Sequence, residues 1–222
     1  MVEWECMAPG ATFRFNTKFD QTILLGRKAS NVAELCHGVR TVPDASIYFH
    51  THKFLQQHHY LSPEPPNDFA YWTTHVLNEE TLGEQLSSVD IIQFHSISAL
   101  RQRIGDLIDG YLQSAYRSVD APEGQEFYFM STQTFVLATR YEARDLAEFA
   151  EALRHISIHS LYFHVFDATL RLTQGENDFS LWFRAQGKPR LADELLRLDP
   201  YTYILEGLRQ ALIGIVERYA DD

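Results

Sequence analysis

The chain has 222 residues, of which 45% are hydrophobic, and its formal net charge at pH 7 is −11. This composition favours a packed globule over a disordered chain. Because no basic block is present to neutralise phosphates, it argues against binding to nucleic acid or to an anionic membrane surface. No apolar run approaches the roughly 20 residues that cross a bilayer, and the acidic N-terminus lacks the features of a signal peptide, so a cytoplasmic protein is expected. Two cysteines, Cys6 and Cys36, are too few for a disulfide framework.

The first half of the chain predicts one strand followed by five helices. Alternating residues over 13–25 favour the strand. Helices are expected at 31–40 with Asn31 as N-cap, from Ser46 onward, from Asn67-Asp68 onward, at 80–88 and at 98–116. A short acidic stretch rich in turn residues, 118–125, then indicates a linker.

The second half predicts the same elements in the same order. They are a strand at 127–139 and helices at 145–155, from Ser160, from Asn177-Asp178, at 189–198 and at 203–219. The long last helix of each half has apolar residues along one face.

The two halves are also related in sequence. Residues 15–50 align without a gap on residues 129–164, at a spacing of 114, with nine identities in 36 positions: Phe15/Phe129, Ala29/Ala143, Ala33/Ala147, Glu34/Glu148, Arg40/Arg154, Ser46/Ser160, Tyr48/Tyr162, Phe49/Phe163 and His50/His164. Further along, Asn67 to Trp72 correspond to Asn177 to Trp182 at a spacing of 110. We therefore predict a mainly α fold of the α+β type, made of two homologous copies, 1–117 and 126–222, packed about a pseudo-twofold axis. The strands of the two copies could pair in a small sheet that rests on the helices.

The repeated signature carries a family resemblance. It consists of Ser-hydrophobic-Tyr-Phe-His, Asn-Asp-Phe-x-x-Trp, a Leu-rich helix and a Leu-Arg helix. It resembles a prokaryotic family catalogued as domain of unknown function 5752, here as two tandem copies, most clearly from Phe127 to Arg209. Members are often encoded beside glycosyltransferases and other carbohydrate enzymes, so the resemblance implies an accessory role in sugar metabolism. It implies no catalytic residues.

Ser46 and Ser160 precede apolar helical patterns, and we interpret them as N-caps, because no Gly-x-Ser-x-Gly turn or nearby base marks a nucleophile. His50 and His164 follow four residues later, after Tyr48 and Tyr162. Each imidazole is either a partly buried side chain with one partner or a general base. Arg171, which could hold an anionic group, is replaced by Gln57 in the first copy.

The Asn-Asp pairs precede helices that contain Trp72 and Trp182. One residue of each pair is expected to cap its helix. The other, from the set Asn67, Asp68, Asn177 and Asp178, could bond the nearby histidine or a ligand hydroxyl. The tryptophans are core residues by default, and sugar-stacking platforms if they line a cleft.

His50, His52, His58 and His59 form a local cluster, but no metal site is predicted because His-Glu-x-x-His and Cys-x-x-Cys patterns are absent from the sequence. Glycine-rich phosphate loops are also absent, and no cofactor is expected.

Two hypotheses follow. The first is a non-catalytic adaptor whose partner is a protein, such as a glycosyltransferase, with homodimer formation as an open alternative. The second is a sugar- or sugar-phosphate-binding sensor or enzyme, with a cleft between the copies lined by Tyr162, His164, Arg171, Asp178 and Trp182. A cleft requires His164 and Asp178 to face a common point, whereas an adaptor requires them to be paired internally and an apolar surface to be exposed elsewhere.

Overall fold

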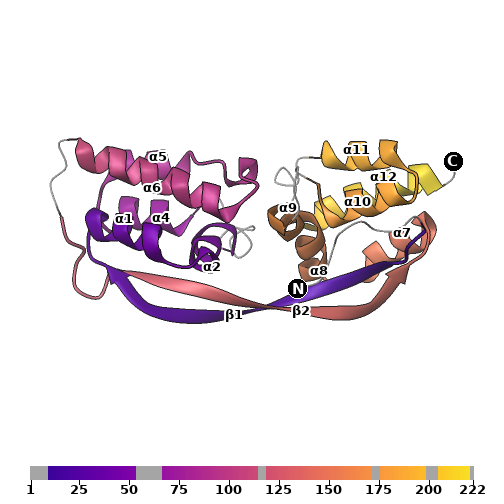
Figure 1. Cartoon of the computed structure of the whole chain (residues 1–222), viewed down its shortest axis with the longest axis horizontal. Coiled ribbons are helices and arrows are strands. Elements are labelled where there is room, and N and C mark those ends of the chain that lie inside the picture. The colour runs from indigo at the N-terminus through magenta and orange to yellow at the C-terminus, as the bar shows by residue number, and fades with distance from the viewer. Residues whose placement is uncertain (1–9, 54–66, 115–118, 172–175, 199–204, 221–222) are drawn as a thin grey trace. The chain divides into compact units, whose positions relative to one another are not determined.

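The computed structural model describes residues 10–53, 67–114, 119–171, 176–198 and 205–220 (Figure 1). Cys6, Gln57, His58 and His59 lie outside the described residues. The elements, in chain order, are β1 (Phe13–Ala29), α1 (Val32–Thr41), α2 (Asp44–Tyr48), η1 (Phe49–Lys53), α4 (Asp68–His75), α5 (Glu80–Ser87), η2 (Ile91–Gln93), α6 (Ile97–Gln113), β2 (Phe127–Ala143), α7 (Leu146–His155), α8 (Ile158–Tyr162), η3 (Phe163–Asp167), α9 (Ala168–Arg171), α10 (Asp178–Ala185), α11 (Pro189–Leu196) and α12 (Leu205–Ala220).

Over the described residues the fold is mainly helical with a two-stranded sheet, as expected for an α+β chain. β1 and β2 are antiparallel, since Lys28 contacts Glu126 at one end and the Thr139 hydroxyl donates to the Phe15 carbonyl near the other. Each strand runs four residues beyond its predicted end, to Ala29 and Ala143. Most side chains in these extensions are exposed, so no buried face marked them in the sequence.

Some of the helix caps were predicted from the sequence and others were not. Asn31 and Asp145 cap α1 and α7 through their side chains, as expected. The prediction that Ser46 and Ser160 are N-caps is wrong, because α2 begins at Asp44 and α8 at Ile158, so both serines lie buried inside helices. Ser157 is the residue that caps α8.

The chain divides into two compact units, and their boundaries fall inside both strands. The continuous unit comprises residues 20–134, and the discontinuous unit comprises residues 1–19 together with 135–222. This division differs from the predicted copies at 1–117 and 126–222, because each strand begins in one unit and ends in the other.

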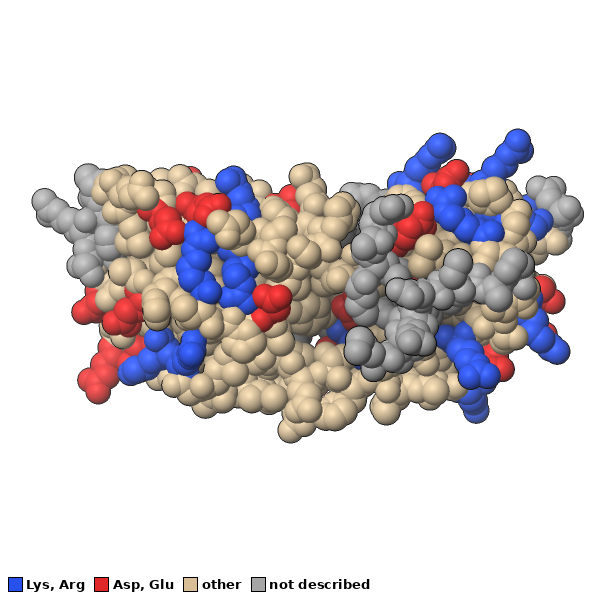
Figure 2. Space-filling model, viewed as in Figure 1, with Lys and Arg blue, Asp and Glu red and all other residues tan. Residues whose placement is uncertain are grey.

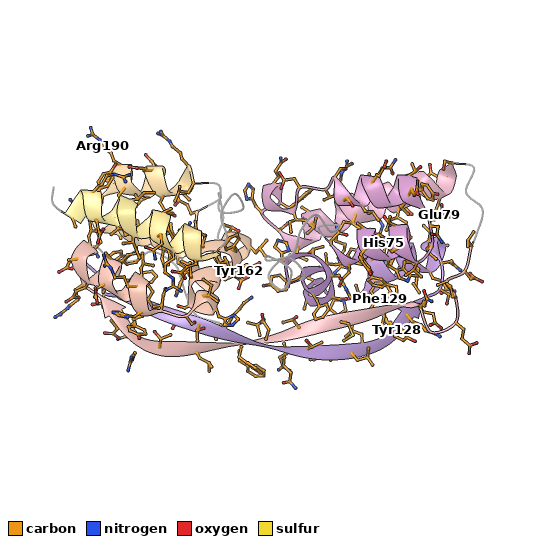
Figure 3. All side chains as sticks on the ribbon, turned by 180° about the vertical axis from the view of Figure 1, so that it is seen from behind. His75, Glu79, Tyr128, Phe129, Tyr162 and Arg190 are labelled. Atoms are coloured by element: carbon orange, nitrogen blue, oxygen red, sulfur yellow. The ribbon has the colours of Figure 1, made fainter. Side chains whose placement is uncertain are left out.

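The core of the continuous unit combines helices α1 to α6 with the start of β2. Phe127 and Phe129 are buried there against Leu35, Val39 and Phe69. All labelled helices of this unit lie on one side of its strand segments in Figure 1. In Figure 3, Phe129 lies on the helix side of β2 and Tyr128 on the opposite side, as strand alternation requires.

Gly38 of α1 allows this close packing. A Cβ atom at that position would lie 2.1 Å from the Phe129 ring, so only glycine permits the contact between helix and ring.

The core of the discontinuous unit combines helices α7 to α12 with the start of β1. Phe13 and Phe15 are fully buried among Phe149, Phe179 and Trp182 in a cluster of edge-to-face ring contacts. Thus the first strand residues complete a core whose helices come from the second half of the chain. No helix among the described residues is long and apolar enough to cross a membrane.

Candidate functional site

His164 lies in the π-helical segment η3, and both of its ring nitrogens are engaged within the discontinuous unit. Nδ1 lies 2.7 Å from Oδ2 of Asp178, and Nε2 accepts the backbone N–H of Asn16 at 2.8 Å. Since Nε2 accepts a hydrogen bond, the proton of the neutral ring is on Nδ1 and is donated to the carboxylate. Both side chains are fully buried.

His50 repeats this arrangement within the continuous unit. It lies in the π-helical segment η1, with Nδ1 2.7 Å from Oδ2 of Asp68 and Nε2 accepting the N–H of Met130 at 3.0 Å. The imidazole is buried, whereas the Asp68 side chain is 28% exposed. In both units, therefore, an Asp-His pair from the helices binds the backbone of a strand that comes from the other half of the chain.

This geometry assigns the histidines a structural role. A general base needs an imidazole lone pair that can reach a substrate proton. The Nε2 lone pair of each histidine is directed at a strand N–H instead. The Asp-His pair that recurs in both halves thus acts as a clamp on the strand, which we call the strand clamp: His50-Asp68 on Met130, and His164-Asp178 on Asn16.

The asparagines before the clamp carboxylates are the helix caps. The Asn67 side chain accepts the Ala70 N–H at 2.8 Å. The Asn177 side chain accepts the Ser180 N–H at 2.9 Å, and the Ser180 hydroxyl accepts the Asn177 N–H at 2.9 Å. Because asparagine caps the helix, the following aspartate is available for the histidine, which accounts for both residues of the pair.

The tryptophans add a second contact, to the residues just before each strand. Trp182 donates its indole N–H to the Ala11 carbonyl at 2.7 Å, and Trp72 donates to the Gln125 carbonyl at 2.7 Å. Both side chains are buried in their cores, so the core interpretation of these rings holds in this structure. A ring enclosed in this way offers no face to a sugar.

The tyrosines pack on aromatic neighbours in each unit. Tyr162 is buried, stacks on Phe166 and lies 5.2 Å from the Lys18 ammonium, which pairs with Asp167 at 2.6 Å. Tyr48 stacks on His52. Arg171 ends α9, and its side chain lies outside the described part of the structure.

Two arginines of the repeated Leu-Arg motif were not among the candidate site residues, although they make specific contacts in the structure. Arg101 donates to the Val39 carbonyl at 2.7 Å, and Arg209 donates to the Leu153 and Ile156 carbonyls at 2.7 Å each. Each guanidinium joins the long helix of its unit to the C-terminal end of the first helix, where carbonyls lack intrahelical partners. In the sequence, the role of these arginines was indicated only by the Leu-Arg motif that both halves share.

A groove of about 570 Å³ is present in the continuous unit between β1 and α1. Arg27 and Lys28 line it from the strand, and Glu34, His37 and Thr41 line it from the helix. Among the described residues, no group of three or more His, Cys, Asp and Glu side chains has the arrangement of a metal site.

Large apolar side chains are exposed where the strands leave the helical cores. In the discontinuous unit these are Phe19, Phe135, Val136 and Leu137, and the rings of Phe19 and Phe135 lie 6.5 Å apart. In the continuous unit they include Ile23 and Leu24. On the face shown in Figure 2, acidic and basic side chains are interspersed over the helices, and no field of one sign is visible.

These features define an α+β protein with a two-stranded sheet. Histidine side chains of helices distant in sequence bind each strand, and tryptophan side chains bind the residues just before it. The chain belongs to the family of unknown function DUF5752, whose profile matches residues 10–217. One match spans both halves, so the expectation that the family domain occurs here as two tandem copies is not supported.

A solved structure described as "The structure of OrfY from Thermoproteus tenax" is similar to this chain, with 27% sequence identity and a TM-score of 0.79. The similarity covers 97% of this chain and 98% of that one. No curated protein matches.

Proposed function

We propose that this protein is a non-catalytic adaptor that binds another protein, accessory to a carbohydrate enzyme such as a glycosyltransferase, in the cytoplasm. The observation that carries the proposal is the exposed apolar strand surface formed by Phe19, Phe135 and Leu137 in the discontinuous unit, while Val136 is exposed on the opposite face of β2. Contiguous exposed apolar side chains are typical of surfaces that bind a partner.

The exposure of these side chains is large. Phe19 is 59% exposed and Leu137 is 52% exposed, although both belong to residue types that are usually buried. β1 and β2 pair with each other along one edge, and this pairing covers neither face of the sheet. A protein partner would remove this apolar area from water and gain roughly 25 cal/mol per Å² buried, before the costs of association.

The internal contacts of the candidate catalytic residues also favour an adaptor over an enzyme. His164 binds Asp178 through Nδ1 and accepts the Asn16 backbone N–H at Nε2, as the adaptor hypothesis requires. The alternative function, a sugar- or sugar-phosphate-binding cleft between the copies with His164 as base, gains no support from these contacts. The link to carbohydrate enzymes comes from the family resemblance alone.

We also propose that the chain arose by internal duplication with exchange of the leading strands. Supporting this, the residues of the two strand clamps correspond in sequence: His50 to His164 and Asn16 to Met130 at a spacing of 114, and Asp68 to Asp178 at a spacing of 110. The indole acceptors Ala11 and Gln125 are related by the spacing of 114. The predicted packing of the two copies about a pseudo-twofold axis is part of this duplication proposal.

The adaptor proposal is tested by co-purification of the tagged protein from its source cells, with mass spectrometry of the bound material. A double variant, Phe135→Thr with Leu137→Thr, keeps strand-forming residues but removes apolar area. Val119→Thr changes an exposed apolar residue outside the strands and serves as the control. We expect a stoichiometric carbohydrate enzyme with the wild type and Val119→Thr, and its loss with the double variant.

Recovery of the chain alone, or of a homodimer, would contradict the adaptor proposal. Equal recovery of the same partner with the double variant would contradict the strand surface as its binding site.

A further inference from the structure

The groove between β1 and α1 in the continuous unit takes no part in the strand clamp or in the exposed apolar surface. Its volume of about 570 Å³ is in the range of small-molecule sites. Gly38 and Phe129 contribute its apolar lining. It therefore has the size and part of the surface that a small ligand requires.

Arg27 provides a cation that has further N–H donors beyond its bond to Thr41. Its Nη1 donates to the Thr41 hydroxyl at 3.2 Å, and none of the ion pairs found among the described residues involves this guanidinium. Arg40 and Arg101 of the same unit, in contrast, each bind carboxylates. A guanidinium has five N–H donors, and its fork matches a phosphate or carboxylate in a bidentate arrangement.

Glu34 provides acceptors at the other end of the groove. One carboxylate oxygen accepts the Ser30 N–H at 2.7 Å near the start of α1, whereas Arg27 is bonded to Thr41 at the end of this helix. Thr41 lies seven positions after Glu34 on the helix, which corresponds to about 10 Å along the axis. His37 lies between them on α1 and also lines the groove.

We propose that this groove binds a small phosphate ester that carries hydroxyl groups. Arg27 binds the phosphate at the Thr41 end, and Glu34 accepts hydrogen bonds from the hydroxyls at the other end. The Glu34 carboxylate disfavours a second anionic group nearby, so the ligand class is a monophosphate. This site is independent of the proposed protein partner, because it uses neither the exposed strand residues nor the clamp.

The discontinuous unit provides an internal comparison. At the sequence spacing of 114, Arg27 and Lys28 correspond to Tyr141 and Glu142, so both cations are missing there. The residue matching Thr41 is His155, which binds Glu151 and stacks on Tyr141. The ligand is therefore expected in the continuous unit only.

Isothermal titration calorimetry of the full chain with glucose 6-phosphate, ribose 5-phosphate, glycerol 3-phosphate, glucose and inorganic phosphate tests the proposal. We expect at least one ester to bind at one site per chain, more tightly than inorganic phosphate and with no binding of glucose. Arg27→Gln should weaken that affinity at least tenfold. Arg140→Gln, which changes an exposed arginine of the discontinuous unit, should leave it unchanged.

A matched pair of substitutions tests the location. Ala33→Glu puts a carboxylate into the groove and should abolish binding, whereas Ala147→Glu, at the corresponding exposed position of α7, should not. Far-UV circular dichroism checks that each variant is folded. Absence of binding by all the esters, or equal loss with both Glu variants, would overturn the proposal. Binding of inorganic phosphate as tight as that of the esters would overturn the role of Glu34.

Discussion

The backbone N–H of Asn16 donates to Nε2 of His164 at 2.8 Å, although these residues are 148 positions apart in the chain. The bond ties the first strand to helices near the other terminus, and it fixes the proton of the imidazole on Nδ1, facing Asp178. His164 and Asp178, which the sequence suggested as candidate catalytic residues, therefore stabilise the fold by holding the first strand.

The substitution His164→Phe should destabilise the discontinuous unit by about 2–4 kcal/mol. It leaves the Asn16 N–H without an acceptor and the buried Asp178 carboxylate without its donor, and each loss is costly inside a core. Urea denaturation followed by circular dichroism measures the change. His155→Phe, at an exposed histidine of α7, is the control and should shift stability by no more than about 0.5 kcal/mol. Equal effects of both variants would contradict the clamp.

The carboxylates of the two clamps should differ in importance. Asp178→Ala removes the acceptor of a fully buried imidazole and should cost about 1–3 kcal/mol. Asp68→Ala should cost less, because the Asp68 side chain is 28% exposed and water can replace it as acceptor.

Asn177→Ala should cost about 1 kcal/mol as the loss of a helix cap. Thermal and urea midpoints of the three variants rank these effects, and a larger loss for Asp68→Ala than for Asp178→Ala would contradict the assignment.

The elements with local signals could be predicted from the sequence, and the exchange of strands could not. Asn31, Asn177 and Asp145 marked their helices because a capping side chain acts on the next three residues. Phe15 and Phe129, in contrast, each follow another Phe two positions earlier, and they match each other at the repeat spacing. No local sequence pattern specifies which set of helices each ring packs against. A boundary between the two copies at 118–125 was therefore the natural expectation.

The role of the candidate site residues was ambiguous for a related reason. Buried Asp-His pairs occur both in catalysis and in structure, and the distinguishing group here is a backbone N–H from a distant strand. A main-chain donor has no side-chain signature. The π-helical segments that present His50 and His164 were likewise not predictable from the helical period, and their place was taken by a continuous second helix in the sequence-based prediction.

The strand exchange predicts which fragment of the chain folds alone. A fragment of residues 20–134 contains α1 to α6 together with Phe127, Phe129 and Met130, and it should fold as a monomer with a cooperative thermal transition. A fragment of residues 1–117 has the same helices but lacks those strand residues, so its core is incomplete. It should show no such transition as a monomer.

Circular dichroism and light scattering on the two fragments make this comparison. Addition of a peptide of residues 119–134 to the 1–117 fragment should restore the transition, because it supplies the two rings and the clamped N–H. A stable, cooperative monomer of 1–117 without the peptide would contradict the exchange.

Cys36 should be an unreactive thiol with an alkaline titration. Burial raises its pKa to about 12, and the hydrogen bond from its thiol to Asp109 Oδ1 at 3.0 Å acts in the same direction. Asp109 has a lowered pKa, because Cys36 and Arg40 donate to its ionised form. Since the thiol pKa is raised on folding, its contribution to stability is present below the ordinary value of 9 and is lost as the pH rises through about 12.

Alkylation by iodoacetamide in a Cys6→Ser background measures this effect. At pH 8 the folded protein should react about 1000-fold more slowly than the protein in denaturing urea, because the raised pKa lowers the thiolate fraction by that factor. Asp109→Asn removes the carboxylate that accepts the thiol proton, so it should speed the reaction. Asp106→Asn also removes a partner of Arg40 but leaves the thiol contact intact, and it should not speed the reaction. The same acceleration by both substitutions would mean that Arg40, and not the thiol bond to Asp109, controls Cys36.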